Sequence, residues 1–254
     1  MSRRLGRAFG LLILVVTAGI WLALDGLAWP ARAITTFLLA PLPALLLLQA
    51  RLLDELPPET EREGVYLSSA ISIWVLAALA MLAARYSGLT RADLRIVPIS
   101  LPLLLGAAGL TTLAGLAIVA AGRALRIPES ALVDYLIPRT PAEKIAFTGL
   151  SVSAGIAEEL VFRSFLILVL FQASGSMVTA VVISVAAFAV AHAYQGVVGV
   201  VRVVALGLVL TAPFLLTGSV YPSMIAHAVL DLLAGLVLAD WLQAGPEPGP
   251  PGNR

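Results

Sequence analysis

The sequence contains no cysteine, and only two of its 254 residues are histidines. The absence of cysteine excludes disulfide bridges and thiolate metal sites, and it leaves the redox compartment open. Charged residues are also scarce, since they make up 12% of the chain against about 25% in an ordinary soluble domain. The net charge is +1, and the basic residues lie between apolar segments without forming a patch. Nothing in this pattern indicates a nucleic-acid partner.

Long apolar runs take the place of charge. Hydrophobic residues make up 60% of the chain, and its mean hydropathy is +0.99. The uncharged runs cover residues 8–24, 33–50, 64–84, 96–122, 164–191 and 203–226. Several of these runs meet the roughly 18 to 20 residues that a membrane-spanning helix needs. The sequence therefore predicts a polytopic membrane protein with the lipid bilayer as its surroundings.

The predicted fold is an all-α membrane helix bundle of about eight transmembrane helices. The expected spans are 10–26, 33–51, 65–84, 101–122, 144–172, 176–194, 198–217 and 221–241. Residues 1–130 form an N-terminal set of transmembrane helices without a motif, and residues 131–244 form the segment that carries the motifs described below. The tail 245–254 is rich in proline and glycine, so we expect it to be disordered.

The basic residues indicate an orientation in the cell membrane. With the N-terminus in the cytoplasm, eleven Lys and Arg residues fall on the cytoplasmic side and four on the other side. The positive-inside rule then places both termini in the cytoplasm. A rival interpretation takes residues 1–33 as a cleaved secretory signal, although the apolar run is long for a signal and Asp25 follows it.

One predicted span carries several charges. In the stretch AGIAEELVFRSF, residues 154–165, the helix holds Glu158, Glu159 and Arg163. The preceding TPAE, residues 140–143, reads as a capping box that starts this helix. Glu159 and Arg163 are four residues apart and can pair, whereas Glu158 points about 100° away and has no partner in its own segment. Because a central charge costs about 2.5 to 3.5 kcal/mol, another part of the fold must satisfy Glu158.

Both histidines of the chain also lie inside predicted spans. His192 ends FAVAH and His227 begins HAVLD, so Phe188 and Asp231 share a helix face with their respective histidines. A lone buried charge is often part of a structural ion pair. Two histidines, an aspartate and a glutamate pair in the later spans indicate a functional site instead.

The stretches AEELVFR, FAVAH and HAVLD resemble three motifs of the CPBP family, the intramembrane CAAX-protease and bacteriocin-processing proteins, also called Abi. The family pattern is EExxxR, FxxxH and HxxxN or HxxxD in this order. The resemblance covers about residues 140 to 240, and the first half of the chain matches only as hydrophobic spans. It identifies residues 131–244 as a CPBP-like catalytic core.

The resemblance implies a membrane endopeptidase, a hydrolase that cleaves a membrane-associated peptide or protein in a water-filled cavity. Glu158 would activate the attacking water with His192, and His227 and the residue at position 231 would stabilise the oxyanion. The remaining motif residues would give structural support, with Glu159 and Arg163 holding the helix and Phe188 packing beside the site.

Position 231 does not fit this scheme fully. Asparagine can donate a hydrogen bond to an oxyanion, but an ionised aspartate only accepts. Asp231 would do better by accepting from His227 and orienting its ring, or by binding a metal. Cofactor dependence therefore stays open between none and zinc, which would be held by His192, His227 and Glu158. The zinc-protease motif HExxH is absent.

The two histidines are hard to bring together by counting along the spans. His192 falls near the end of one predicted span and His227 near the start of another, with one crossing between them. They can meet if helix ends lie inside the protein and the intervening span bends, for which Gly207 and Pro213 are suitable positions. The sequence therefore predicts an interior cavity.

Two other functions remain open. One is a non-catalytic membrane scaffold or bacteriocin-immunity protein of the same fold, and the other is a proton-coupled transporter that uses the ionisable groups as a relay. The substrate of a peptidase is not written in the sequence. One Lys against fifteen Arg favours a GC-rich prokaryotic source. In the family that the motifs resemble, the eukaryotic members trim prenylated C-termini, so a prenylated substrate is not expected here.

Overall fold

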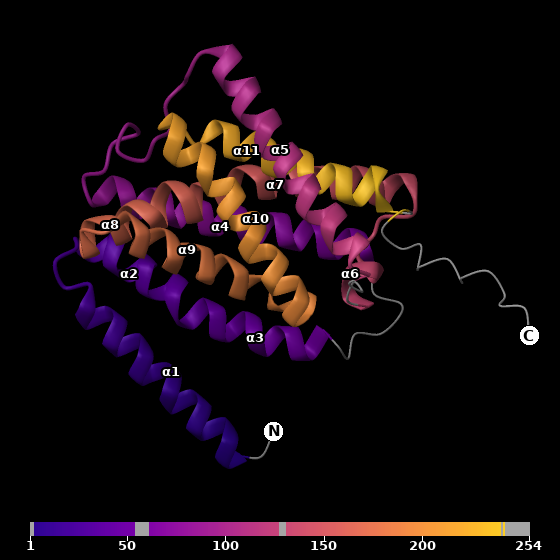
Figure 1. The fold of residues 1–254 in the computed structure, drawn as a ribbon. Helices are drawn as coiled ribbons and strands as arrows, with labels where there is room; N and C mark the ends of the chain where they lie inside the picture. The colour runs from indigo at the N-terminus through magenta and orange to yellow at the C-terminus, as the bar shows by residue number, and fades with distance from the viewer. Residues whose placement is uncertain (1–2, 54–60, 127–130, 240, 242–254) are drawn as a thin grey trace, which may run out of the picture.

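The computed structural model describes residues 3–53, 61–126, 131–239 and 241, and within these ranges the chain forms helices joined by turns (Figure 1). The elements are α1 (Arg3–Ala23), α2 (Trp29–Leu39), α3 (Pro41–Leu53), α4 (Arg62–Tyr86), α5 (Leu101–Ala124), α6 (Ala131–Tyr135), α7 (Pro141–Glu159), the π-helix η1 (Leu160–Ile167), α8 (Leu168–Ser174), α9 (Met177–Ala191), the 3₁₀ turn η2 (Ala193–Gln195), α10 (Gly196–Thr217), α11 (Tyr221–Leu232) and the π-helix η3 (Leu233–Val237). The predicted disordered tail, 245–254, lies outside the described residues.

Every predicted span coincides with helix, which confirms the all-α fold, but the number of about eight crossings is not confirmed. Four helical stretches are long and apolar enough to cross a membrane, namely Trp29–Gln49, Arg62–Tyr86, Leu101–Ala124 and Ala193–Thr217. The stretches Ala8–Ala23, Met177–Ala191 and Tyr221–Val237 are apolar but shorter. The predicted second span is divided between α2 and α3 because Ala40 precedes Pro41 and leaves the helical conformation.

The start of α7 follows its sequence signal. The Thr140 hydroxyl accepts from the Glu143 backbone at 3.1 Å, and the Glu143 carboxylate accepts from the Thr140 backbone at 3.1 Å. The predicted capping box is therefore confirmed, with Pro141 in the first turn. Hydrogen bonds from the backbone of Arg139 and Thr140 hold the pKa of Glu143 below its usual range. Arg62 of α4 reaches the same carboxylate at 3.2 Å, so the N-terminal half fixes where α7 begins.

From this start one continuous helical stretch runs through α7, η1 and α8 to Ser174, where Gly175 ends it in the left-handed conformation with a φ of 67°. The π-helical part begins directly after Glu159 and contains Arg163. Its residues 161–167 are all buried. Such π segments are rare and occur mostly at functional sites.

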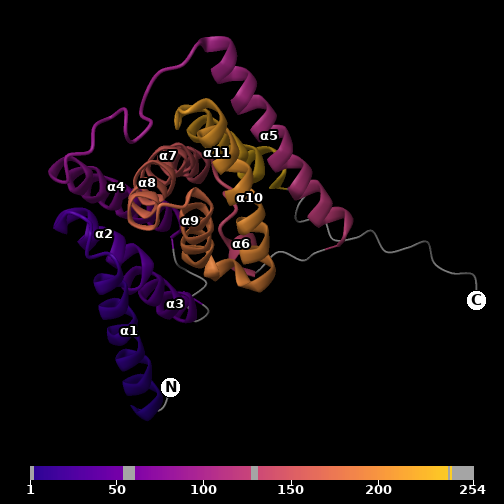
Figure 2. The ribbon, with the colours of Figure 1, turned by 60° about the vertical axis from the view of Figure 1, so that its left-hand side comes forward.

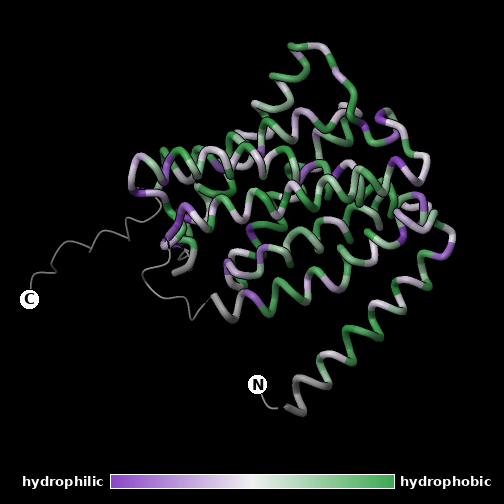
Figure 3. The backbone as a smooth tube through the Cα atoms, turned by 180° about the vertical axis from the view of Figure 1, so that it is seen from behind, coloured by the Kyte–Doolittle hydropathy of each residue, from purple (hydrophilic) through white to green (hydrophobic). Residues whose placement is uncertain are grey.

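The helices form a central group with flanking members. α4, α7, α9 and α11 lie together, α10 crosses α9 obliquely, and α1 and α5 lie at the two edges of the bundle (Figures 1 and 2). Apolar residues run along the helices, and hydrophilic residues gather mainly near the turns (Figure 3). Large apolar side chains are exposed on the flanking helices, including Leu14 on α1 and Leu110 on α5. Exposed apolar surface of this extent suits a lipid environment.

Small residues let α11 approach its neighbours closely. A Cβ atom added at Gly155 of α7 would lie 2.7 Å from both the Cβ and the backbone N of Ala228. A Cβ atom at Gly115 of α5 would lie 2.6 Å from Cδ1 of Leu230. Gly155 therefore sets the distance of α11 from α7, and Gly115 leaves room for the Leu230 side chain.

The connection before α5 is fastened to the turn between α10 and α11. Nη1 of Arg95 donates to the Phe214 carbonyl at 2.9 Å, and the guanidinium lies 4.7 Å from the centre of the Phe214 ring. The Arg95 carbonyl accepts from the Val220 backbone at 3.0 Å, and the Val97 carbonyl accepts from the Ser219 hydroxyl at 2.7 Å. The bond to Phe214 caps the C-terminal end of α10, where carbonyl groups lack helical partners, and the other two bonds hold the turn that follows α10.

Replacing Arg95 by alanine should therefore destabilise the protein. The loss of a hydrogen bond from a charged group is expected to cost about 1.5 to 3 kcal/mol, visible as a lower midpoint of thermal unfolding in detergent. Arg91→Ala, at an exposed position in the same connection, is the matched control and should leave the midpoint unchanged. Equal midpoints for the two variants would contradict a clamping role for Arg95.

Candidate functional site

The carboxylate of Glu159 lies at the centre of the motif residues. Its side chain is 0% exposed, and Oε1 lies 3.1 Å from Nη1 of Arg163. The same Oε1 lies 2.9 Å from Nδ1 of His227 on α11. The predicted pairing of Glu159 with Arg163 is present, and the contact with His227 adds a link between two helices.

Arg163 extends this group of contacts to α9 and α10. Its side chain is 1% exposed. Nη2 donates to the carbonyl of Gly207 at 3.3 Å, and the guanidinium lies 4.5 Å from the centre of the Phe188 ring. A Cβ atom at Gly207 would lie 3.2 Å from Cγ1 of Val185 and 3.8 Å from Nη2 of Arg163. Glycine at position 207 thus leaves room mainly for Val185 of α9, while α10 continues as one helix that includes Pro213.

Glu158 faces the other nitrogen of the same imidazole. Its side chain is 16% exposed, and Oε2 lies 3.8 Å from Nε2 of His227. Among the described residues this Oε2 has no hydrogen-bond partner. The sequence required a partner for Glu158 elsewhere in the fold, and His227 is the group that faces it. The separation exceeds a direct hydrogen bond, so the carboxylate keeps its capacity to accept a proton from another donor.

Asp231 does not orient His227 as expected. Oδ2 of Asp231 lies 3.7 Å from Nε2 of His227, beyond hydrogen-bond distance, and its side chain is 40% exposed. The ring is held at Nδ1 by Glu159 instead. Asp231 lies one helical turn beyond His227 and near the opening of the site, where it remains available to solvent or to a bound peptide.

His192 ends α9 and turns its ring back on that helix. Nδ1 lies 2.8 Å from the carbonyl oxygen of Phe188. A carbonyl only accepts, so Nδ1 carries the hydrogen, and Nε2 of the neutral ring is left as an acceptor.

The two histidines share one aromatic neighbour. The centre of the Phe188 ring is 4.6 Å from that of His192 and 6.1 Å from that of His227. The structure therefore brings together the two imidazoles that counting along the spans had separated.

The zinc alternative does not fit this arrangement. Within the part of the chain that the structure describes, no three His, Cys, Asp or Glu side chains are placed to hold a metal ion. In both histidines Nδ1 contacts an oxygen atom, the Phe188 carbonyl for His192 and the Glu159 carboxylate for His227, so Nε2 is the nitrogen that a metal would have to use. No chemical step is assigned to a metal.

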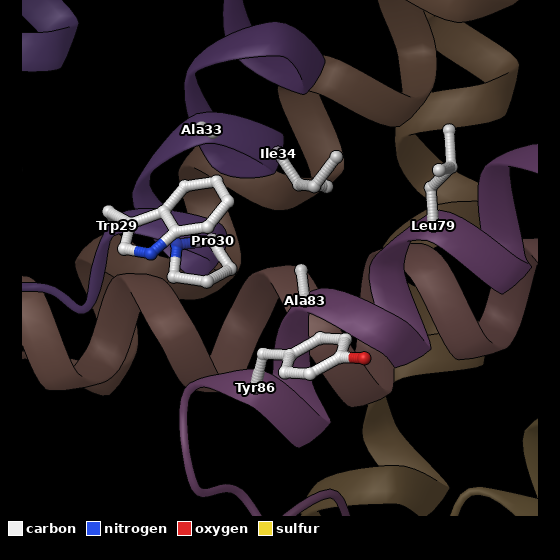
Figure 4. A pocket seen from close by; sticks show the side chains of 7 residues that line it. All are labelled: Trp29, Pro30, Ala33, Ile34, Leu79, Ala83 and Tyr86. Atoms are coloured by element: carbon white, nitrogen blue, oxygen red, sulfur yellow. The ribbon is translucent and has the colours of Figure 1, made fainter.

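Two pockets lie away from the motif residues. One has a volume of about 390 Å³ and lies between α2 and α4 (Figure 4); it is lined by Trp29, Pro30, Ala33, Ile34, Leu79, Ala83 and Tyr86. The other has a volume of about 440 Å³ and is lined by Leu116, Val119, Ala120, Leu238 and Trp241. The interior cavity expected around the histidines remains a prediction. Partial exposure of Glu158, His192 and Asp231 shows where the site opens.

Two features of the site were not foreseen from the sequence. The first is that Glu159 holds His227 across two helices. The second is Tyr194, whose ring centre lies 5.9 Å from that of His192. The sequence places Tyr194 two residues after the second motif, which could have pointed to it, but the motif pattern itself does not include position 194.

Comparison with known proteins bears on residues 141–233. This segment matches the family model described as type II CAAX prenyl endopeptidase Rce1-like. It spans all three motifs, from the start of α7 to the start of η3. No curated protein matched the chain, and no solved structure matched it. The match confirms the resemblance that the three motifs indicated: residues 141–233 are similar to the Rce1-like CAAX endopeptidase family.

Proposed function

We propose that this protein is an intramembrane endopeptidase that hydrolyses a peptide bond of a membrane-associated substrate with a water activated by Glu158. One observation carries the proposal. Of two adjacent glutamates, Glu159 is fully buried and contacts Arg163 and His227 through Oε1, while Glu158 is partly exposed and its nearest charged neighbour, Nε2 of His227, lies 3.8 Å away. Among the described residues Oε2 of each glutamate lacks a hydrogen-bond partner, so the two differ in the contacts of Oε1 and in exposure. A carboxylate on a partly exposed side chain, with an oxygen that makes no hydrogen bond within the described residues, is suited to act as a general base.

The hydrolytic step uses Glu158 and His192 together. The water oxygen bonds to the peptide carbonyl carbon, the water proton passes to Glu158, and the C=O π electrons move onto the carbonyl oxygen. Nε2 of His192 is an acceptor because Nδ1 donates to Phe188, so it can hold the water through its second hydrogen. The tetrahedral intermediate then carries one oxyanion.

His227 is the group placed to meet this charge. Nδ1 faces the Glu159 carboxylate, and Nε2 faces the carboxylates of Glu158 and Asp231, so both nitrogens lie where an N–H can donate. In the intermediate, Nε2–H would donate to the oxyanion. Because Glu159 fixes the ring through Nδ1, the donor is preorganised before the substrate arrives.

Collapse of the intermediate completes the reaction. The C=O bond re-forms, the C–N bond breaks, and the proton held by Glu158 passes to the departing nitrogen. The products are a carboxylic acid and an amine, which become a carboxylate and an ammonium group when the acid proton passes to the amine, and Glu158 is ready to accept another proton. The chain's own residues supply every group in this sequence, so the proposal needs no cofactor.

The setting of the reaction follows from the apolar helices. We place the protein as a multi-pass protein of the cell membrane with both termini in the cytoplasm, because the Lys and Arg residues favour that side. The lipid bilayer and a peptide or protein substrate are its partners in this proposal. The partly exposed carboxylates mark the side from which the peptide enters.

Substitution of the reacting groups should abolish cleavage of a quenched peptide panel by the protein purified in detergent. Removal of a general base costs about 10²- to 10⁴-fold in rate, so Glu158→Ala and His192→Ala should each fall in that range. His227→Ala should lose activity as well. Glu63→Ala, at an exposed position in the first turn of α4, is the control and should match the wild type. A chelator should change nothing.

Different results would support the other functions. Full function of Glu158→Ala would contradict the peptidase and favour a scaffold or immunity role. Loss of activity with a chelator and recovery with zinc would overturn the metal-free mechanism. Proton uptake by reconstituted vesicles that depends on Glu158, without any peptide cleavage, would favour a transporter.

The two neighbouring glutamates should differ in their effect on stability. Breaking a buried ion pair costs about 3 to 5 kcal/mol, so Glu159→Gln should lower the thermal midpoint in detergent clearly. Glu158→Gln should leave it nearly unchanged, because this side chain makes no hydrogen bond through its buried oxygen. Circular dichroism or a dye-based melt measures both variants. Similar midpoints would contradict the division between a holding and a reacting glutamate.

A further inference from the structure

The site has few groups that can donate to an oxyanion. Glu158 and Asp231 both face Nε2 of His227, and ionised carboxylates only accept. A negative charge that develops beside two carboxylates needs donors aimed at it. His227 supplies one through Nε2, and position 231, where an asparagine would supply another, holds an aspartate.

Tyr194 brings a hydroxyl to this side of the site. It lies in η2, two residues after His192, and its ring centre is 5.9 Å from that of His192 at an interplanar angle of 35°. The His192 ring beside it is 4.6 Å from the centre of the Phe188 ring, which is also the aromatic neighbour of His227. The residue is partly exposed, as Glu158 and His192 are.

Among the residues that the structure describes, the Tyr194 hydroxyl accepts a hydrogen bond and donates none. Nε2 of Gln195 donates to the Tyr194 oxygen at 3.4 Å. The oxygen is the acceptor in this contact, so the O–H hydrogen remains available for another acceptor. Gly199 makes room for this arrangement, because a Cβ atom there would collide with the side chain of Gln195.

Resting on the peptidase function proposed above, we infer that the Tyr194 hydroxyl is a catalytic donor to the oxyanion, in the role that Asp231 cannot fill. Tyr194 and His227 then approach the carbonyl oxygen of the substrate from different elements, η2 and α11. Glu158 keeps the water on the carbonyl carbon. The hydroxyl makes its bond in the intermediate, so it lowers the barrier without tightening substrate binding.

The test is a set of kinetic measurements on full-length protein in detergent, with a cleaved peptide from the panel above. Tyr194→Phe removes only the hydroxyl, and loss of one oxyanion donor costs about 10²- to 10³-fold in kcat. KM should stay within about threefold, since the bond forms in the intermediate. Tyr86→Phe, at an exposed tyrosine that lines the pocket between α2 and α4, is the matched control and should keep wild-type kinetics.

A second variant separates donation from packing. Asp231→Asn supplies an amide donor at position 231, so the loss caused by Tyr194→Phe should be at least about tenfold smaller in the Asp231→Asn background than in the wild-type background. If Tyr194 only packs against His192, the two changes act independently and the loss is the same in both backgrounds. Thermal midpoints measured in parallel show that the variants are folded.

The outcomes separate the two proposals. Wild-type kcat in Tyr194→Phe, or an undiminished loss in the Asp231→Asn background, overturns the role of Tyr194 while Glu158→Ala still shows the peptidase to be correct. Absence of cleavage by the wild type, or full activity of Glu158→Ala, overturns the peptidase, and the role of Tyr194 with it.

Discussion

The contact of one buried carboxylate with two basic side chains holds the site together. Glu159 is 0% exposed and meets both Arg163 and His227 through the same oxygen, Oε1. A charge without a partner at this depth would cost several kcal/mol. The pairing offsets this cost, and it also ties α7 to α11 and, through Arg163, to Phe188 on α9 and Gly207 on α10. Any movement of these helices would separate charges in an apolar interior.

Local signals in the sequence predict the parts of the site that lie within one helix. The capping box at Thr140 and the spacing of Glu159 and Arg163 depend on helix geometry alone, and both are present in the structure. The orientation of His227 was assigned to Asp231 because the two share a helix face. The structure gives this role to Glu159, because α11 packs closely against α7 at Gly155. Packing between helices decides such contacts, and no periodicity within one helix shows it.

The first half of the chain carries no motif, yet it fixes two ends of the motif-bearing segment. Arg62 reaches Glu143 at the start of α7, and Arg95 caps the end of α10. His227 lies in the second turn of α11, a few residues after that cap. The position of the imidazole therefore depends on contacts made by residues far from it in the sequence. Apolar spans alone predict neither contact, because each involves a residue in a connection or at a helix end.

The adjacent glutamates show why stability and reactivity can coexist in one helical turn. Residues i and i+1 of a helix point about 100° apart, so Glu159 faces the buried group and Glu158 faces the opening. Buried polar atoms in folded proteins are nearly always hydrogen-bonded, yet Oε2 of Glu158 has no such partner in the described part of the chain. Oε2 of Glu159 lacks a partner too, but Oε1 of Glu159 contacts both Arg163 and His227, whereas Oε2 of Glu158 lies 3.8 Å from the nearest charged nitrogen. In the proposed mechanism this difference leaves Glu158 to accept the proton of the water. The two carboxylates of one helical turn therefore differ in surroundings, with Glu159 in a buried ion pair and Glu158 on the partly exposed side.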